Sequence, residues 1–387
     1  MENKAFIHAK IYTMNGPVLE NAALLWKGDK IVAVGGRLDL PADTEILDLQ
    51  GKTVTPGFID AHTHIGILEE IYQTEGDDVN EDTDPVTPQL RALDAVNPYD
   101  LAFEDAVSGG ITTVMTGPGS SNVVAGTSLV MKTAGKDLHK MVLNPAAGLK
   151  VAFGENPKRT YYEQKKSPVT RMGIAALLRQ AFIDAQVYER KIEKCQKDEE
   201  VLERELGLET LLEVLRRKMP LRAHAHRADD IMTALRIARE FECELVIEHG
   251  TEAHKVIPEL SKAGVPIVLG PTFSNRSKVE LAELSWQSAA RLQEAGILVA
   301  LTTDHSVTPV QYLPLCAALA VKYGMEETAA LQAITINPAR ILKLEHRIGS
   351  LACGKDADMV VLSGHPLDWR TRVETVYIDG ESVYVHL

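Results

Sequence analysis

The sequence predicts an α/β protein, a (β/α)8 TIM barrel accompanied by a small β domain that both ends of the chain form. Three observations support this prediction. Short runs at both ends alternate apolar and polar residues, the middle alternates apolar strands with helical stretches, and the middle contains eight candidate strands. Eight parallel strands are the number at which such a barrel closes, and 387 residues exceed the roughly 250 that a barrel needs.

Composition narrows the class of protein. The chain carries 41 Lys and Arg against 54 Asp and Glu, a net charge of −13, and 45% of its residues are hydrophobic. These values are typical of globular proteins, and the acidic charge disfavours nucleic acid as a partner. The four cysteines are scattered without a Cys-x-x-Cys pair, which favours a reducing, cytoplasmic location. No apolar stretch approaches the length of a membrane span, so we expect no membrane association.

The β domain is predicted from the two chain ends. Near the start we expect strands at 5–12, 22–26 and 30–34, and near the end at 358–362, 373–378 and 382–386. The last two strands are separated by Asp379-Gly380, a typical hairpin turn. We therefore assign residues 1–52 and 345–387 to this domain and residues 53–344 to the barrel.

The barrel strands are expected in apolar runs, each followed by a connection. They are 53–59, 112–116, 128–132, 149–153, 221–226, 245–249, 266–269 and 298–303, and the connections around the third and fourth are short. A helical insertion is predicted at about 155–218, with two long helices within 170–218, where Gly and Pro are scarce. Its charged run at 189–205 is interpreted as a solvated helix face, with a lid or a contact in a homo-oligomer as the alternative.

Histidines and a carboxylate follow several of these strands. His62 and His64 lie two residues apart on a strand, so both side chains point the same way and can bind one divalent cation. The sequence Ala-His-Ala-His at 223–226, His249 and Asp304 end three further strands. The C-terminal ends of barrel strands meet at the active-site end, so these side chains are expected to converge.

In these motifs the sequence resembles the amidohydrolase superfamily, and within it the imidazolonepropionase-related branch. The resemblance covers nearly the whole chain. It rests on Pro-Gly-Phe-Ile-Asp-Ala-His-Thr-His at 56–64, Gly-Ile-Thr-Thr-Val at 110–114, Ala-His-Ala-His at 223–226, Ile-Glu-His-Gly at 247–250, Thr-Thr-Asp-His at 302–305 and Asn-Pro-Ala at 337–339. It implies a (β/α)8 barrel with a composite β-sandwich domain. The metal ligands that it implies are His62, His64, His224, His249 and Asp304, with His226 left to contact the substrate.

The number of metal ions depends on Lys150. Many superfamily members bridge two metals with a carbamylated lysine at the end of the fourth strand, and Lys150 occupies an apolar stretch at about that place. We expect two divalent ions per chain, with zinc as the metal, and a single ion if Lys150 is not carbamylated. Manganese, nickel and iron suit the same ligands. A lysine held in a salt bridge is the alternative interpretation.

The resemblance implies an enzyme that hydrolyses a C–N bond of a small molecule, an amide, a peptide-like bond or a cyclic amide. Metal-bound hydroxide would attack, and Asp304 would transfer the proton to the leaving nitrogen. Arg159 and Arg171 flank the helical insertion and are candidates to bind a substrate carboxylate. The alternatives are a deaminase with one metal ion and a non-catalytic barrel. The residues after His64 lack the arginine and tyrosine of imidazolonepropionases, so that substrate is not implied.

Overall fold

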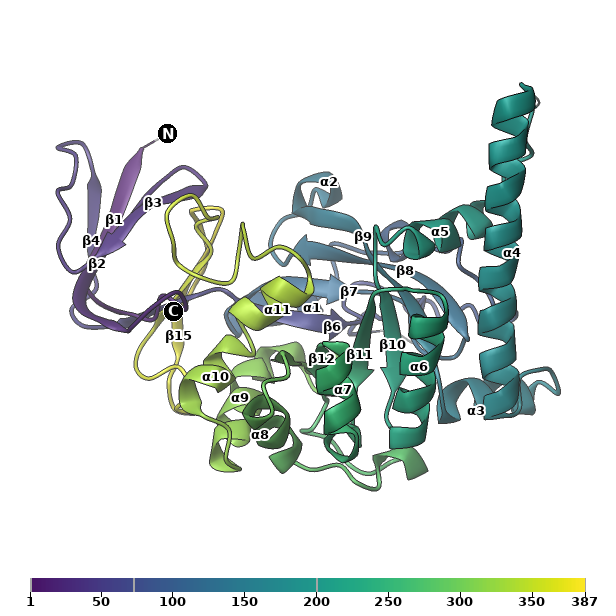
Figure 1. Cartoon of the computed structure of the whole chain (residues 1–387). Helices are drawn as coiled ribbons and strands as arrows, with labels where there is room; N and C mark the ends of the chain where they lie inside the picture. Colours follow the sequence, from purple (N-terminus) through teal and green to yellow (C-terminus); the bar gives the residue numbers. More distant parts are fainter. Residues whose placement is uncertain (1, 72–73, 200, 387) are drawn as a thin grey trace.

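The computed structural model describes residues 2–71, 74–199 and 201–386. These residues form two β-sheets, one built from the chain ends and one from the middle of the chain. Figure 1 shows the sheet of the chain ends on one side of the barrel, near both termini, and the long helix α4 on the opposite side. None of the described helices is long and apolar enough to cross a membrane.

Eight strands from the two chain ends form the first sheet. Their order is β16-β15-β14-β5-β1-β2-β3, with β4 paired to β1. Strand β5 unites the two ends, because it pairs with β1 from the start of the chain and with β14 from its end. The strands are β1 (Asn3–Ile11), β2 (Leu19–Lys27), β3 (Lys30–Gly35), β4 (Glu45–Asp48), β5 (Thr53–Pro56), β14 (Met359–Leu362), β15 (Val373–Ile378) and β16 (Glu381–Val385).

The second sheet also has eight strands, in sequence order, and is the predicted barrel. One prediction is wrong: β8 runs antiparallel to both of its neighbours, so the eight strands are not all parallel. The connections on either side of β8 are too short for a helical crossover, which a parallel neighbour requires. The strands are β6 (Phe58–Thr63), β7 (Ile111–Thr116), β8 (Val124–Lys132), β9 (Val142–Ala152), β10 (Leu221–Ala225), β11 (Leu245–His249), β12 (Ile267–Leu269) and β13 (Val299–Leu301).

The first predicted barrel strand, 53–59, is also corrected, because the chain divides it between the two sheets at Gly57. Residues 53–56 form β5 in the sheet of the chain ends, and β6 begins at Phe58 in the barrel. A Cβ atom at position 57 would lie 2.0 Å from the hydroxyl oxygen of Thr112. Only glycine fits between the strands where the chain passes from one sheet to the other.

Helices surround the barrel, and three of them occupy the predicted insertion between β9 and β10. Helix α4 is long, and α5 is shorter than predicted. The helices are α1 (Ala102–Ser108), α2 (Leu138–Met141), α3 (Glu155–Glu163), α4 (Arg171–Asp198), α5 (Leu206–Leu215), α6 (Ala228–Glu240), α7 (Ile257–Ala263), α8 (Gln287–Glu294), α9 (Leu313–Lys322), α10 (Glu327–Gln332) and α11 (Ile336–Ile341). The side chain of Thr170 caps α4 by accepting the N–H of Gly173.

A buried carboxylate connects the first barrel strand with the segment that follows the last. Asp60 on β6 accepts hydrogen bonds from the hydroxyls of Thr302 and Thr303, both at 2.6 Å, and from the main-chain N–H of Thr303 at 2.9 Å. The main-chain N–H of His64 donates to the carbonyl of His305 at 2.9 Å. These contacts bring the two ends of the barrel sheet together.

A buried lysine joins the barrel to the sheet of the chain ends. The ammonium of Lys132 on β8 lies 3.2 Å from Asp356 and 3.2 Å from Asp379, and it also pairs with Asp358. Lys132 is 1% exposed, so water does not screen these interactions. The relative placement of the two sheets therefore depends on this cation.

Replacing Lys132 with methionine should lower the free energy of unfolding by about 3–5 kcal/mol, because the buried Asp358 loses its counter-ion, whereas Asp356 keeps Arg347 and Lys30. The measurement is urea unfolding followed by tryptophan fluorescence. Lys140→Met is the control, since the side chain of Lys140 is 85% exposed and pairs only with the exposed Asp137. A Lys132→Met protein as stable as the control would contradict the role given to this cluster.

Candidate active site

The histidines that the sequence singled out lie at the C-terminal ends of barrel strands. His62 lies in β6, His224 in β10 and His249 at the end of β11, and His64 and Asp304 follow β6 and β13. Each strand alternates its side chains, so residues two apart, such as His62 and His64, share the direction into the barrel mouth. All of these side chains except His64 and Asp304 are buried almost completely.

One group forms around Asp304. Its Oδ1 atom lies 3.2 Å from Nε2 of His62 and 3.4 Å from Nε2 of His64. Ligand atoms of His62, His249 and Asp304 all lie within 4.8 Å of one another. Two imidazole nitrogens thus face a single carboxylate oxygen, an arrangement that suits a shared cation.

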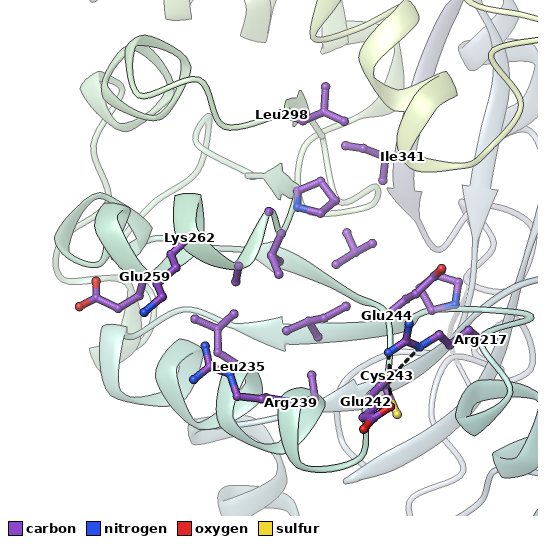
Figure 2. Close-up of a pocket in the computed structure, with 18 of the residues that line it drawn as sticks. Arg217, Leu235, Arg239, Glu242, Cys243, Glu244, Glu259, Lys262, Leu298 and Ile341 are labelled. Atoms are coloured by element: carbon purple, nitrogen blue, oxygen red, sulfur yellow. Dashed lines mark hydrogen bonds and ion pairs between the residues drawn. The ribbon is translucent and has the colours of Figure 1, made fainter.

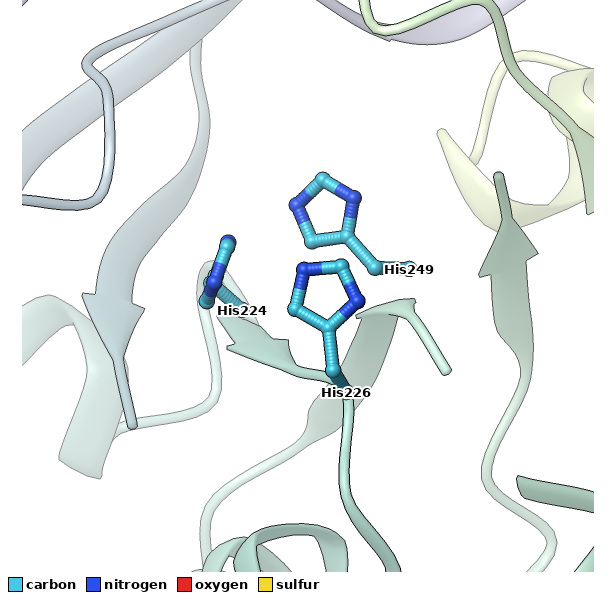
Figure 3. Close-up of side chains that lie close together, drawn as sticks. All are labelled: His224, His226 and His249. Carbon is cyan, nitrogen blue, oxygen red and sulfur yellow. The ribbon is translucent and has the colours of Figure 1, made fainter. Parts of the chain in front are cut away.

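A second group adjoins the first and shares His249 with it. Figure 3 shows His224, His226 and His249 with their rings close together, and their ligand atoms lie within 4.8 Å of one another. The rings of His226 and His249 are stacked at 4.7 Å, and the rings of His224 and His249 are 4.4 Å apart. The structure therefore brings together all five ligands that the resemblance implies, together with His226.

Main-chain carbonyls orient two of the imidazoles. Nδ1 of His64 lies 2.7 Å from the carbonyl oxygen of Gly117, and Nδ1 of His249 lies 2.8 Å from that of Gly270. A carbonyl oxygen only accepts, so in both rings the proton sits on Nδ1 and Nε2 keeps its lone pair. This is the tautomer in which a histidine binds a metal through Nε2.

The donor set fits a divalent metal. Neither ring nitrogen of the buried His62 makes a hydrogen bond within the part of the chain that the structure describes, although carboxylate oxygens lie near both. A buried imidazole without such partners is costly unless something else satisfies it. Imidazole and carboxylate donors suit zinc, manganese, nickel or iron, and His62, His64, His224, His249 and Asp304 supply both kinds.

Lys150 lies beneath the histidines, 1% exposed, and forms an ion pair with Glu248. Glu248 also accepts a hydrogen bond from Nε of Arg222 at 2.9 Å and lies 3.0 Å from Nδ1 of His62. Sequence reasoning missed Glu248, although a carboxylate directly before His249 in an apolar strand was a signal. Lys150 thus has a carboxylate partner, and its carbamylation stays a prediction.

Comparisons with known proteins agree with this geometry. The sequence model of the amidohydrolase family matches residues 53–383. The chain belongs to this family. A structure of an amidohydrolase from Thermotoga maritima is 46% identical, with a TM-score of 0.97 over 99% of this chain and 100% of that one.

Curated relatives place this amidohydrolase in the imidazolonepropionase-related branch. An imidazolonepropionase from Alkaliphilus metalliredigens is 25% identical over 91% of this chain and 86% of its own length. The amidohydrolase tasK of Hapsidospora irregularis is 30% identical over 95% of this chain, which spans only 40% of that protein. The chain is a hydrolase that acts on C–N bonds.

Burial sets the protonation of the site. It lowers the pKa of His224, His226 and His249 well below the usual value of 6.5, so their imidazoles are neutral. Burial also opposes the charged form of Asp304, but the imidazoles of His249, His62 and His64 outweigh it and hold the pKa of that carboxyl well below its usual range. Neutral imidazoles and an ionised carboxylate are the forms that bind a metal.

Two further residues that the sequence did not single out face the second group. Oε1 of Glu280 lies 3.6 Å from Nε2 of both His224 and His226. Lys278 donates to Glu280 at 3.0 Å and to Asn156 at 3.1 Å. Both residues come from the long connection after β12, where no strand or helix pattern marks a functional position.

The predicted arginines have different environments. Arg171 at the start of α4 makes a bidentate ion pair with Asp230, at 2.8 and 3.0 Å. Arg159 on α3 is exposed and makes no ion pair with a described residue. The binding of a substrate carboxylate by these arginines stays a prediction. Arg171 would have to leave its ion pair with Asp230 to bind one.

Acid should destabilise the metal-free protein. Below pH 6.5 histidines of the unfolded chain bind protons, whereas the buried imidazoles of the folded protein stay neutral. As the pH falls, the free energy of unfolding should therefore decrease by up to about 1.4 kcal/mol per pH unit for each such histidine. His62 acts in another pH range: its raised pKa, which the charge of Glu248 causes against burial, adds stability that is complete below pH 6.5 and is lost as the pH rises above 6.5. Above pH 6.5 the lowered pKa values make no contribution.

Urea unfolding of chelator-treated protein between pH 5 and 8 measures this slope. In His226→Gln the slope below pH 6.5 should be smaller by about 1.4 kcal/mol per pH unit, since one proton fewer is taken up. His8→Gln is the control, because the side chain of His8 is 56% exposed. Equal slopes in the two variants would show that His226 is not held neutral.

Proposed function

We propose that the protein is a metal-dependent amidohydrolase that hydrolyses an amide, a peptide-like bond or a cyclic amide in a small molecule. The observation that carries this proposal is the convergence of His62 and His64 on one oxygen of Asp304, at 3.2 and 3.4 Å. His62 and His64 come from the first barrel strand and the residue after it, and Asp304 comes from the segment after the last barrel strand. Two imidazole nitrogens and a carboxylate oxygen are the kinds of donor that bind a divalent cation such as zinc.

The residues that would hold metal divide between the two groups. His62, His64 and Asp304 would bind one ion, and His224 and His249 the other, with Lys150 as a bridging carbamate between them. Zinc is the metal that we propose. A divalent ion in this position lowers the pKa of water to about 7 and polarises a carbonyl group.

Side chains of this protein would carry out the proton transfers. Asp304 is ionised, because its pKa is held well below the usual range, so it can accept a proton from the attacking water. The same carboxyl group would then return that proton to the leaving nitrogen, as general acid. Glu280 and His226 lie beside the site, with Oε1 of Glu280 3.6 Å from Nε2 of His226, and are candidates to contact the substrate.

Glu248 would be a positioning residue for this chemistry. Burial opposes its charged form, but the charges of His62, Lys150 and Arg222 outweigh burial and hold the pKa of Glu248 well below its usual range. Oε1 of Glu248 lies 3.0 Å from Nδ1 of His62, so the anionic carboxylate would accept a hydrogen bond from an Nδ1–H. That contact would leave Nε2 of His62 with its lone pair toward Asp304.

A deaminase of a small heterocycle is the second candidate. It would hold one metal ion and keep Lys150 unmodified, with the ammonium of Lys150 paired to Glu248. A non-catalytic barrel is a weaker candidate, because all five ligand positions keep metal-binding side chains. Metal content and the released product separate these functions.

Metal analysis tests the bridge. The purified protein, grown with zinc and bicarbonate, should contain two equivalents of zinc, and Lys150→Met should contain one, because the bridging oxygen ligands are lost. Lys140→Met, at an exposed position, should keep two. Circular dichroism verifies that each variant is folded. A wild-type protein with one equivalent and an unaffected Lys150→Met would favour the deaminase.

Replacing Asp304 with asparagine should lower kcat by roughly 10²–10⁴-fold or more, because the general acid and base is lost. The assay follows N-acyl amino acids, dipeptides and cyclic amides by the appearance of a new amine or carboxylate. A second panel of amino-heterocycles is followed by ammonia release. Hydrolysis confined to the second panel would overturn the amide assignment, and an active Asp304→Asn protein would overturn the proton transfer.

A further inference from the structure

A groove lies at the end of the barrel opposite the histidines. Its lining includes Leu245 at the start of β11, Pro266 just before β12 and Leu298 just before β13. Because these positions are the N-terminal ends of their strands, the groove is separate from the candidate active site. Its volume of about 880 Å³ lies within the range of small-molecule sites.

The middle of the groove is apolar. Figure 2 shows Leu235, Leu298 and Ile341 among its lining residues, with Glu259 and Lys262 at one end and Arg217 and Glu242 at the other. Further apolar side chains complete the surface: Met232, Ala238, Val246, Val265 and Pro266. A bound molecule would therefore remove apolar surface from water as well as make polar contacts.

The rim of the groove is basic, in a protein whose net charge is −13. Six basic residues line it against three acidic ones, and two of the acids are paired, Glu242 with Arg217 at 3.8 Å and Glu244 with Lys343 at 2.5 Å. Glu259 is the acid that remains. Four cations have no carboxylate within 4 Å among the residues that the structure describes: Arg236, Arg239, Lys262 and Arg340.

Helix dipoles explain only part of this charge. Arg239, Lys262 and Arg340 lie in the last turns of α6, α7 and α11, where cations are favoured. Arg236 lies earlier in α6, and none of the four donates to a main-chain carbonyl among the hydrogen bonds of the described residues. Arg236 donates one hydrogen bond to the hydroxyl of Thr233 at 3.2 Å, and Arg340 donates one to the side chain of Asn337 at 3.5 Å. Each guanidinium has five N–H donors, so both arginines keep donors for a ligand in the groove.

We propose that this groove binds a small organic anion, a carboxylate or phosphate group attached to an apolar body. The anionic group would contact Arg236 and Arg239, and the apolar body would lie on Leu235, Val265 and Leu298. Arginine is suited to both head groups, because its guanidinium donates two parallel hydrogen bonds to either. The proposal is independent of the proposed function, since the two sites lie at opposite ends of the barrel.

Calorimetric titration of the wild-type holoenzyme tests the chemistry of the ligand. Octyl phosphate and octanoate are the two anionic probes, and they distinguish the two head groups. One or both should bind with one-to-one stoichiometry and more weakly as salt is raised, because salt screens exposed charges. Octyl glucoside, which lacks the charge, and inorganic phosphate, which lacks the apolar body, should bind at least ten-fold more weakly.

Variants locate the site. Arg236→Gln combined with Arg239→Gln should raise the Kd of the bound probe about ten-fold or more, since charge-assisted hydrogen bonds are lost. Arg190→Gln, at an exposed position of α4, is the matched control and should leave the Kd unchanged. Asp304→Asn should also leave it unchanged, because Asp304 lies at the other end.

Three results would overturn the proposal. They are the absence of saturable binding by either anionic probe, binding of octyl glucoside as tight as that of the anions, and a Kd that the double variant does not change. A double variant that unfolds at a lower temperature but binds the probe normally would assign these arginines to the helix ends alone. Thermal unfolding of the same samples distinguishes that result.

Discussion

The candidate site depends on the closure of the barrel, and a buried carboxylate provides it. Asp60 is fully buried, which raises its pKa, yet its two oxygens accept bonds from Thr302, Thr303 and the main-chain N–H of His62. His62 belongs to β6 like Asp60, and Thr302 and Thr303 follow β13, so the hydrogen bonds from the two threonines connect the first barrel strand with the last. His62 lies two residues after Asp60, and Asp304 directly follows Thr303, so the closure also restricts the distance between these two side chains.

The sequence was sufficient for the architecture and for the convergence of the candidate ligands, because both follow from local rules. A period of two places His62 and His64 on one side of a strand, and parallel strands end at one rim, so the convergence on Asp304 could be expected. It was not sufficient for β8, since the direction of a strand depends on the length and path of its connections. The division at Gly57 likewise depends on the position of Thr112.

Residues that support the ligands were harder to predict, because their role exists only in three dimensions. The role of Glu248 depends on Arg222 and Lys150. Arg222 lies on the neighbouring strand β10, two residues before the residue paired with Glu248, and Lys150 lies on β9 in register with Arg222. Glu280 reaches the histidines from a long connection without a repeating pattern. The spacing of residues along the sequence does not predict such contacts, because they form only when separate segments of the chain pack around the histidines.

Charge balance gives a physical reason why carbamylation and metal binding should occur together. Around the histidines, the anions Asp304, Glu248 and Glu280 face the cations Lys150, Arg222 and Lys278, so the formal charges of these six side chains cancel. Conversion of an ammonium to a carbamate makes the site more negative by two charges, and one divalent ion restores neutrality. Either change alone would leave an uncompensated charge in a buried site, which is costly. A second ion would add positive charge that an anionic nucleophile or substrate can balance.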